Sequence, residues 1–416
     1  MIACWFAALG AGLLAAARPA PPSLGGEPVP VERLVARRAA LMDRLGTGMA
    51  IVRSAEVRSI AVHHPQDSDY REDNNFFYLT GLEAPGATLL LVARERGADE
   101  AILYLRTPAE LLRLTGIRDI RPSAGSAAEI RSLVLASKSP ARTGGLYLQR
   151  DQQTAAEWDR VQVEDLEPSV AALRLVKDED ELRRLRHATG ITTEALREAM
   201  RAARPGMWEY ELEATIEYGF RRRGAERLGF PSIVGSGPNS TTLHYDKGRR
   251  RTQPDDVVVM DVGAEFGYYT SDVTRTIPIS GRFTPRQRQL YDLVLATQQA
   301  ALDSVRPGIT LAELNRVARS YMRRHSGKLC GRSTCDRFFV HGLSHWLGMD
   351  VHDVGSFATP LAPGMVLTVE PGIYLVDEGL GIRIEDVVLV TEAGSELLST
   401  GVPRTAEGVE REMLGG

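Results

Sequence analysis

The chain has 416 residues, enough for two domains with separate cores, and its 43% hydrophobic and 25% charged residues are ordinary for a soluble globular enzyme. The net charge of -4 gives no electrostatic basis for binding nucleic acid. The aromatic content of 6% also argues against an extended platform for stacked bases.

The first residues differ from the rest of the chain. Ile2 to Ala17 carry no charge and are rich in Ala, Leu and Gly. A run of this length is too short to span a membrane as a helix and is typical of a signal-peptide core. We predict a signal peptide and flexible leader over residues 1–27, a periplasmic or secreted protein, and no stable membrane span. If the start codon is misplaced, the leader is an artefact and the protein is cytoplasmic.

Alternating helix and strand patterns follow the leader and predict an α/β domain over residues 28–175. Helical patterns cover 31–44, 110–114 and 127–136, and strand patterns cover 49–52, 88–92 and 101–105. The residues directly after Lys177 are acidic and basic residues follow them, which predicts a new helix. Acidic residues in the first turn of a helix interact favourably with its dipole. We place the domain boundary before it, which gives a second domain over 176–400 and a C-terminal tail over 401–416.

The second domain contains an internal repeat. Pro205-Gly206 followed by Glu211-Leu212 recurs as Pro307-Gly308 followed by Glu313-Leu314. The stretch 254–263 aligns in the same way with 363–372, so each half supplies a helix, a strand and an acidic residue. Chance similarity at Pro-Gly turns is the alternative, but two ordered matches argue against it. Two such halves packed face to face would bring their acids to one centre.

The most informative stretch is the run 257–276, which contains Asp261 and Asp272. β-Branched and aromatic residues flank Phe266-Gly267, which predicts a β-hairpin with its two-residue turn there. In that register Asp261 lies directly opposite Asp272, with Cβ atoms roughly 5 Å apart. Two like charges so placed are destabilising unless a cation lies between them, and a divalent metal ion is the simplest candidate.

The other half of the repeat supplies two more carboxylates. Glu370 ends one strand-like run and Glu385 lies in another, with a turn signal between them. His345 lies between the two hairpins, in a Gly-containing segment that also holds His341 and His352. Four carboxylates and one imidazole at a single site are compatible with two divalent metals roughly 3.5–4 Å apart. Such an oxygen-rich set suits Mn²⁺, although Co²⁺, Fe²⁺ and Zn²⁺ also bind it. The pattern therefore indicates metal-assisted hydrolysis.

These residues resemble a known family. In order and context they match the five metal ligands of the "pita-bread" metallopeptidases, peptidase family M24: Asp261, Asp272, His345, Glu370 and Glu385. The run 341–353 is similar to its form in the Xaa-Pro aminopeptidase (aminopeptidase P) subgroup, and the resemblance covers roughly residues 30–400. It implies an α+β fold, in which a smaller α/β creatinase-type domain precedes a pita-bread domain with a pseudo-two-fold repeat.

The resemblance also implies an activity. A metal-dependent exopeptidase of this kind hydrolyses the bond between an N-terminal residue and a following proline, by a hydroxide that bridges two divalent metals. Asp261 would bind one metal and His345 and Glu370 the other, whereas Asp272 and Glu385 would bridge them.

The resemblance assigns further roles around the metals. The implied catalytic residues are His244, His341, His352, Glu370 and Arg383. Glu370 would shuttle protons, His352 would stabilise the oxyanion, and His244 would position the substrate and move protons. His341 would line the proline pocket, and Arg383 would hold the carboxylates by hydrogen bonds. One departure is Gly248, where the family often has Asn.

Several alternatives stay open at this point. Prolidase, which acts on Xaa-Pro dipeptides, uses the same chemistry, although Ser344 and Trp346 favour the aminopeptidase form. A non-catalytic peptide-binding module on the same fold and a metal-free amidinohydrolase of the creatinase type both lack these ligands. The implied partners are peptides with proline at the second position and further copies of the chain, as a dimer or tetramer, but no nucleic acid.

Two cysteines lie close together beyond the leader. Cys330 and Cys335 stand in a loop rich in Gly, Ser and Thr. In an oxidising compartment they could form a disulfide, whereas in the cytosol they would be free thiols. The sequence leaves both states open.

Overall fold

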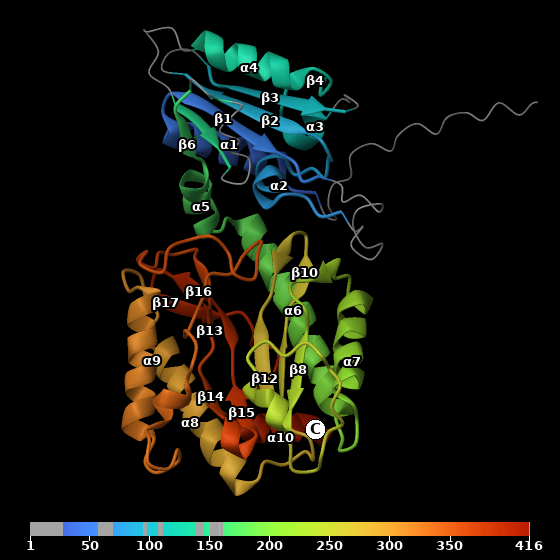
Figure 1. Ribbon diagram of the computed structural model, residues 1–416, viewed down its shortest axis with the longest axis vertical. Coiled ribbons are helices and arrows are strands. Elements are labelled where there is room, and N and C mark those ends of the chain that lie inside the picture. The colour runs from blue at the N-terminus through green and yellow to red at the C-terminus, as the bar shows by residue number, and fades with distance from the viewer. Residues whose placement is uncertain are drawn as a thin grey trace, which may run out of the picture.

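The computed structural model describes residues 28–56, 70–94, 98–106, 111–137, 145–149, 158 and 161–415. The predicted leader, residues 1–27, lies outside them. The described residues form a smaller N-terminal domain above a larger C-terminal domain (Figure 1). Within these residues, no helix combines the length and the apolarity needed to cross a membrane.

The N-terminal domain is built on a mixed six-stranded sheet in the order β4-β3-β2-β1-β5-β6. Its strands are β1 Gly48–Arg53, β2 Thr88–Ala93, β3 Glu100–Leu105, β4 Asp119–Pro122, β5 Gly145–Leu148 and β6 Val163–Asp165. Its helices are α1 Val31–Leu45, α2 Asn74–Thr80, α3 Leu112–Thr115, α4 Ser126–Ser137 and α5 Glu167–Leu175. The first three predicted strands and the helices at 31–44 and 127–136 are confirmed within one or two residues.

Both faces of this sheet are covered, because successive strand residues point to opposite sides. Ala50 and Val52 belong to the core shared with α1, α2 and α5, whereas Ile51 packs in a second core with Ile130 and Val134 of α4. Figure 1 shows α4 above the sheet and α1 and α2 below it, toward the C-terminal domain. The predicted α/β class of this domain is confirmed.

The C-terminal domain places two helix pairs outside a set of strands (Figure 1). Its helices are α6 Glu179–Ala202, α7 Glu209–Arg222, α8 Pro285–Leu302, α9 Leu311–His325 and α10 Ala406–Met413, with short 3₁₀ helices η3 Gly237–Thr241, η4 Cys335–Phe338 and η5 Val376–Glu378. The strands of the first half are β7 Arg227–Leu228, β8 Ile233–Ser236, β9 Val257–Val262, β10 Ala264–Phe266, β11 Tyr269–Thr270 and β12 Val273–Pro278. Those of the second half are β13 Val366–Val369, β14 Gly372–Leu375, β15 Leu380–Arg383, β16 Asp386–Thr391 and β17 Gly394–Leu397.

The predicted repeat is visible in the topology. Each half has a helix pair, a strand, a short hairpin and a returning strand, so that β9 pairs with β12 and β13 pairs with β16. The turns before α7 and α9 match as well, because Gly206 and Gly308 have φ angles of 88° and 89°, a left-handed conformation that favours glycine. The α+β fold with two similar halves is therefore confirmed.

Both ends of this domain are held by specific contacts. The Asp178 side chain accepts from the backbone N–H groups of Asp180 and Glu181, and Glu181 reaches back to Asp178, which forms a capping box at the start of α6. Residues 401–416, which the sequence suggests as a tail, contain α10. Its Ala406 and Val409 are buried, and the helix packs against α6.

The first hairpin has a different register from the predicted one. Phe266 pairs with Tyr269, so Gly267 and Tyr268 form the turn, one residue later than predicted. Both have positive φ, 56° and 71°, as a type I′ turn requires. Asp261 pairs with Thr274, and the prediction that it directly opposes Asp272 is wrong.

The cause of the shift is a tertiary contact. Tyr268 is fully buried, its hydroxyl donates to Glu83 at 2.6 Å, and its ring stacks on Phe77 with centroids 3.8 Å apart. These contacts with the N-terminal domain hold a tyrosine in a conformation that usually selects Gly or Asn. Asp272 is consequently a diagonal neighbour of Asp261 on the same side of the ribbon.

Candidate metal centre

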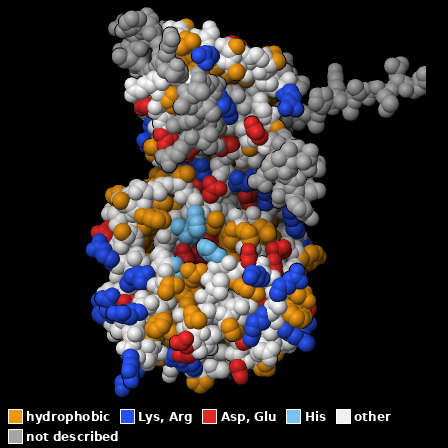
Figure 2. Space-filling view, viewed as in Figure 1, with side chains coloured by type: hydrophobic (Ala, Val, Ile, Leu, Met, Phe, Trp, Pro, Cys, Tyr) orange, Lys and Arg blue, Asp and Glu red, His pale blue; other side chains and the backbone are white. Residues whose placement is uncertain are grey.

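The acidic residues of the site stand where the long strands of each half begin or end. Asp261 lies on β9 and Asp272 directly precedes β12, while Glu370 directly follows β13 and Glu385 directly precedes β16. His345 lies in the segment between η4 and β13. Figure 2 shows histidine side chains gathered on one face of the C-terminal domain, around a hollow with acidic groups. Both halves of the repeat therefore contribute to one site.

His345 lies among the carboxylates. Its Nε2 is 3.3 Å from Asp272 Oδ2 and 3.5 Å from Glu370 Oε1. Ligand atoms of Asp272, His345 and Glu385 all lie within 4.8 Å of one another. Nδ1 of His345 is 3.0 Å from the Trp346 carbonyl oxygen, which assigns the proton to Nδ1. The lone pair on Nε2 is thus directed at the carboxylates, as in a metal-ligating histidine.

The electrostatics of this cluster call for positive charge. Burial and the neighbouring Asp261 raise the pKa of Asp272 well above its usual value. Burial and Glu385 do the same to the pKa of Glu370, and burial and Asp272 to that of Glu385. Asp261 Oδ1 and Asp272 Oδ1 are buried and have no hydrogen-bond partner among the residues that the structure describes. Buried carboxylate oxygens without donors fit divalent cations, which would supply the missing charge.

Arg383 supports the carboxylates from β15. Its guanidinium donates to Asp261 Oδ2 at 2.6 Å, to the Tyr374 hydroxyl at 2.9 Å and to Thr274 Oγ1 at 3.1 Å. Thr274 in turn donates to Glu385 Oε2 at 2.6 Å. Burial alone would lower the pKa of Arg383, but Tyr374 and Asp261 raise it well above its usual value. Arg383 therefore stays charged and fixes carboxylates from both halves.

His341 is held at one side of the site. Its Nδ1 is 2.8 Å from the Gly342 carbonyl oxygen and its Nε2 is 2.8 Å from the Tyr374 hydroxyl. Burial and the charge of Arg383 lower the pKa of His341 to about 4, so the ring is neutral at pH 7. The Tyr374 hydroxyl, which accepts from Arg383, then donates to Nε2. Sequence reasoning missed Tyr374 and Thr274, although the correct strand register would have paired Thr274 with Asp261.

Two histidines lie at the exposed rim. The His352 and His345 rings meet edge-on, with centroids 4.4 Å apart. Burial, His345 and His244 all lower the pKa of His352, which indicates that His244 is near enough to act on it. His244 itself is exposed, in the segment between η3 and β9. The structure therefore brings all the candidate site residues to one region.

A buried carboxylate anchors the segment that carries His244. Glu209 Oε1 accepts from the Ser236 amide and hydroxyl and from Asn239 Nδ2 at 2.7–2.9 Å. Its Oε2 accepts from the Tyr245 hydroxyl at 2.8 Å and the Arg250 amide at 2.9 Å. Nothing in the sequence pattern singles out Glu209, because its partners are spread over many residues.

The departure at Gly248 has a simple explanation. Gly248 lies in the same segment as His244 and has a φ of 56°. Among common residues, Gly and Asn adopt this left-handed conformation most readily. Gly therefore suits the same backbone conformation as the Asn that the family often has.

The two cysteines are bonded to each other. A disulfide joins Cys330 and Cys335, whose Cα atoms are 5.2 Å apart. The bonded loop leads into η4 and then to His341, and Arg319 of α9 donates to the His341 carbonyl oxygen at 2.8 Å. The disulfide thus lies on the segment that connects α9 to one side of the site.

The fold and the site define a class of protein. Residues 183–392 match metallopeptidase family M24, and residues 34–112 match the N-terminal domain of aminopeptidase P. The chain belongs to this metallopeptidase family.

Individual relatives show which members of this family the chain is similar to. The chain is 33% identical to the Xaa-Pro aminopeptidase of Escherichia coli (strain K12), over 91% of this chain and 96% of that one. It is 37% identical to the Xaa-Pro dipeptidase of Homo sapiens over 60% of this chain and 62% of the other. The solved structure of E. coli aminopeptidase P with the inhibitor Pro-Leu matches with a TM-score of 0.83 and 30% identity, over 93% of this chain and 99% of that one.

Proposed function

We propose that this protein is a metal-dependent aminopeptidase that releases the N-terminal residue from peptides with proline at the second position. The buried cluster of Asp272, His345 and Glu385 next to Asp261 and Glu370 carries the proposal. The likeness to the Xaa-Pro aminopeptidase extends over both domains, whereas that to the Xaa-Pro dipeptidase covers 60% of the chain. This difference in coverage favours the aminopeptidase over the dipeptidase.

The cluster would hold two divalent ions. The residues that would bind them are Asp261, Asp272, His345, Glu370 and Glu385, four carboxylates and one imidazole. An oxygen-rich donor set supports Mn²⁺ as the native metal. Divalent ions in such a site supply a strong nucleophile near neutral pH and stabilise negative charge on a carbonyl oxygen.

The side chains around the cluster would bind the peptide and move protons. Glu370 is half-buried and its Oε1 lies 3.5 Å from His345 Nε2, so it would take a proton at the site and deliver it to the leaving amine. His352 at the rim would donate a hydrogen bond to the carbonyl oxygen as it gains charge. His244 would position the peptide, and the neutral His341 ring against Tyr374 would line the proline pocket.

A pair of peptides tests the proposal. Ala-Pro-Ala and Ala-Pro are incubated with the purified protein and with Asp272→Ala, and free alanine is measured. We expect alanine to be released from the tripeptide by the wild type and not by the variant. Release from the dipeptide alone would overturn the aminopeptidase assignment in favour of a dipeptidase.

We also propose that the protein is exported and forms a homo-oligomer. The uncharged run at its N-terminus and the Cys330–Cys335 disulfide support export, because disulfides persist in oxidising compartments. N-terminal sequencing of the protein recovered from the periplasm or the medium checks removal of the leader. Light scattering after size exclusion checks the predicted dimer or tetramer.

A further inference from the structure

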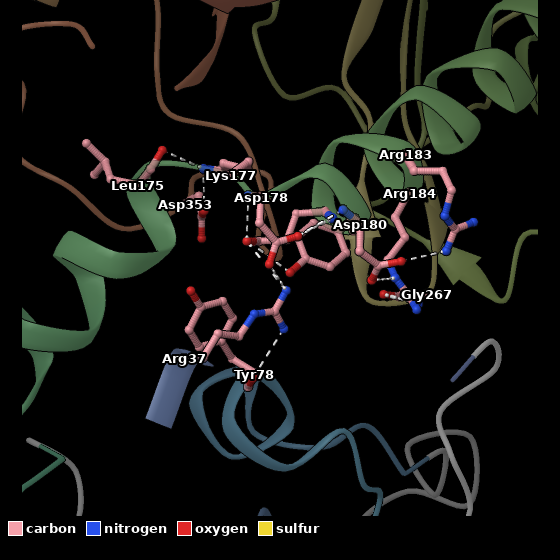
Figure 3. Close-up of polar contacts among 12 residues, drawn as sticks. Arg37, Tyr78, Leu175, Lys177, Asp178, Asp180, Arg183, Arg184, Gly267 and Asp353 are labelled. Carbon is pink, nitrogen blue, oxygen red and sulfur yellow. Dashed lines mark hydrogen bonds and ion pairs between the residues drawn. The ribbon is translucent and has the colours of Figure 1, made fainter. Parts of the chain in front are cut away.

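The residue after His352 is buried in an ion-pair cluster at the junction of the two domains. The Asp353 carboxylate accepts from Arg174 Nη2 at 2.6 Å and from Lys177 Nζ at 3.2 Å. These three side chains are between 1% and 3% exposed, so the charges are shielded from solvent. Arg174 lies in α5 of the N-terminal domain and Lys177 in the link to α6. Figure 3 shows Lys177 between the Leu175 carbonyl and Asp353.

The backbone around Asp353 turns, so that one side chain is buried while its neighbour is exposed. The Asp353 amide donates to the Trp346 carbonyl at 3.0 Å, and the Gly348 amide donates to the Asp350 carbonyl at 3.2 Å. A Cβ at Gly348 would lie 2.0 Å from Asp353 Oδ2, so this close approach requires glycine. Asp353 is buried while His352 is exposed at the metal site. A shift of the Asp353 carboxylate would therefore displace the His352 backbone and ring.

The N-terminal domain also contacts the preceding residues of this segment. Arg71 donates to the Met349 carbonyl at 3.0 Å, and Asn74 of α2 donates to Asp350 Oδ2 at 2.7 Å. Arg174 donates to Asp350 Oδ2 at 3.3 Å as well. Residues from two segments of the N-terminal domain, 71–74 and α5, thus contact the stretch that leads to His352.

Stability alone gives a weak reason for such a cluster. The cost of removing charges from water offsets most of their attraction, and an apolar set of similar volume often stabilises a fold equally well. Directed ion pairs differ from apolar contacts because they fix the position of each partner. The cluster is therefore better suited to hold one arrangement of the His352 segment than to add stability.

We infer that Arg174 and Lys177 are positioning residues which, through Asp353, hold His352 in the orientation that catalysis needs. The N-terminal domain then contributes to the reaction without touching the substrate. The inference rests on the proposed function, in which His352 stabilises charge on the carbonyl oxygen.

A double-mutant cycle on Ala-Pro-Ala hydrolysis tests this inference. We expect Asp353→Asn to lower kcat by about 10- to 100-fold, the order expected when a catalytic group is misplaced by about 1 Å, and to leave KM nearly unchanged. In a His352→Ala background the same substitution should lower kcat no further, because there is no ring left to position. Metal content per chain should equal that of the wild type.

If Asp353→Asn does not fold, variants of Lys177 provide a second double-mutant cycle with His352→Ala. Lys177→Met should lower kcat and Lys177→Arg should keep most of it. The matched control is Arg33→Met, which removes a cation from an exposed pair with Glu179 across the same domain junction, and its kcat should not change.

The outcomes separate the two proposals. If Asp353→Asn or Lys177→Met lowers kcat by the same factor with and without His352, the role is structural and the inference is wrong. The inference is also wrong if His352→Ala leaves kcat unchanged in an active enzyme. A wild type that does not cleave Ala-Pro-Ala would overturn the proposed function, and this inference with it.

Discussion

Glu209 offers a prediction whose magnitude follows from its hydrogen bonds. In Glu209→Gln the amide nitrogen should replace Oε2, because Oε1 accepts three of the five bonds. The Tyr245 hydroxyl can rotate and accept a hydrogen bond from that nitrogen. The Arg250 backbone N–H can only donate, so it loses its acceptor. One unsatisfied buried group costs about 1–3 kcal/mol, and the remaining bonds lose their charge assistance. We expect the free energy of unfolding to fall by about 2–3 kcal/mol.

Urea unfolding of the two proteins measures this loss, and Ala-Pro-Ala hydrolysis measures its effect on the site. Because Tyr245 adjoins His244, we expect kcat/KM to fall by about tenfold. Glu217→Gln, two turns along α7, is the matched control and should change stability by no more than about 0.5 kcal/mol. A Glu209→Gln protein as stable as this control would refute the view that Glu209 anchors the His244 segment.

Three further predictions concern the metals, pH and the disulfide. Asp272→Asn should reduce binding of both metals, whereas Asp261→Asn should mainly weaken one; metal analysis of the purified variants checks this, and equal losses would count against the assignment. Burial raises the pKa of Glu181 from its ordinary 4.5 to about 7 despite the opposing charge of Arg37, so the folded state holds this proton more tightly than the unfolded state. The free energy of unfolding should therefore fall as pH rises from about 4.5 to about 7. Glu181→Gln should remove up to about 3 kcal/mol of that fall between pH 5 and pH 8. Urea unfolding of both proteins at the two pH values measures the difference. Replacing both Cys330 and Cys335 by Ser should lower stability by about 2 kcal/mol, the chain-entropy value for so short a loop, and an unchanged urea midpoint would contradict this.

The repeat explains why much of this fold could be predicted from the sequence. Its Pro-Gly turns, helices and strands depend on local patterns, and the structure has them in both halves. The acids near the strand ends could be found in the same way, because their positions follow the repeat. The predicted register of the first hairpin was wrong because contacts with Phe77 and Glu83 hold Tyr268 in the turn conformation. These two residues are distant from Tyr268 in the sequence, so local patterns do not reveal the contacts.

The supporting residues could not be found from local patterns. Glu209 bonds to groups 27 to 41 residues away, and Asp353 bonds to residues 176 and 179 positions earlier. A single acidic residue in a sequence has the same appearance whether it is buried in support of a site or lies on the surface. Such residues are identified by the donors that converge on them, which the folded structure alone brings together.

Restoring metal to stripped protein tests the central claim most directly. The protein is treated with a chelator, and Ala-Pro-Ala hydrolysis is followed as Mn²⁺ is added in known equivalents per chain. We predict no hydrolysis by the stripped protein and full recovery only as the second equivalent binds. Hydrolysis that survives stripping, or that recovers fully with one equivalent, would contradict a centre in which five side chains hold two metals.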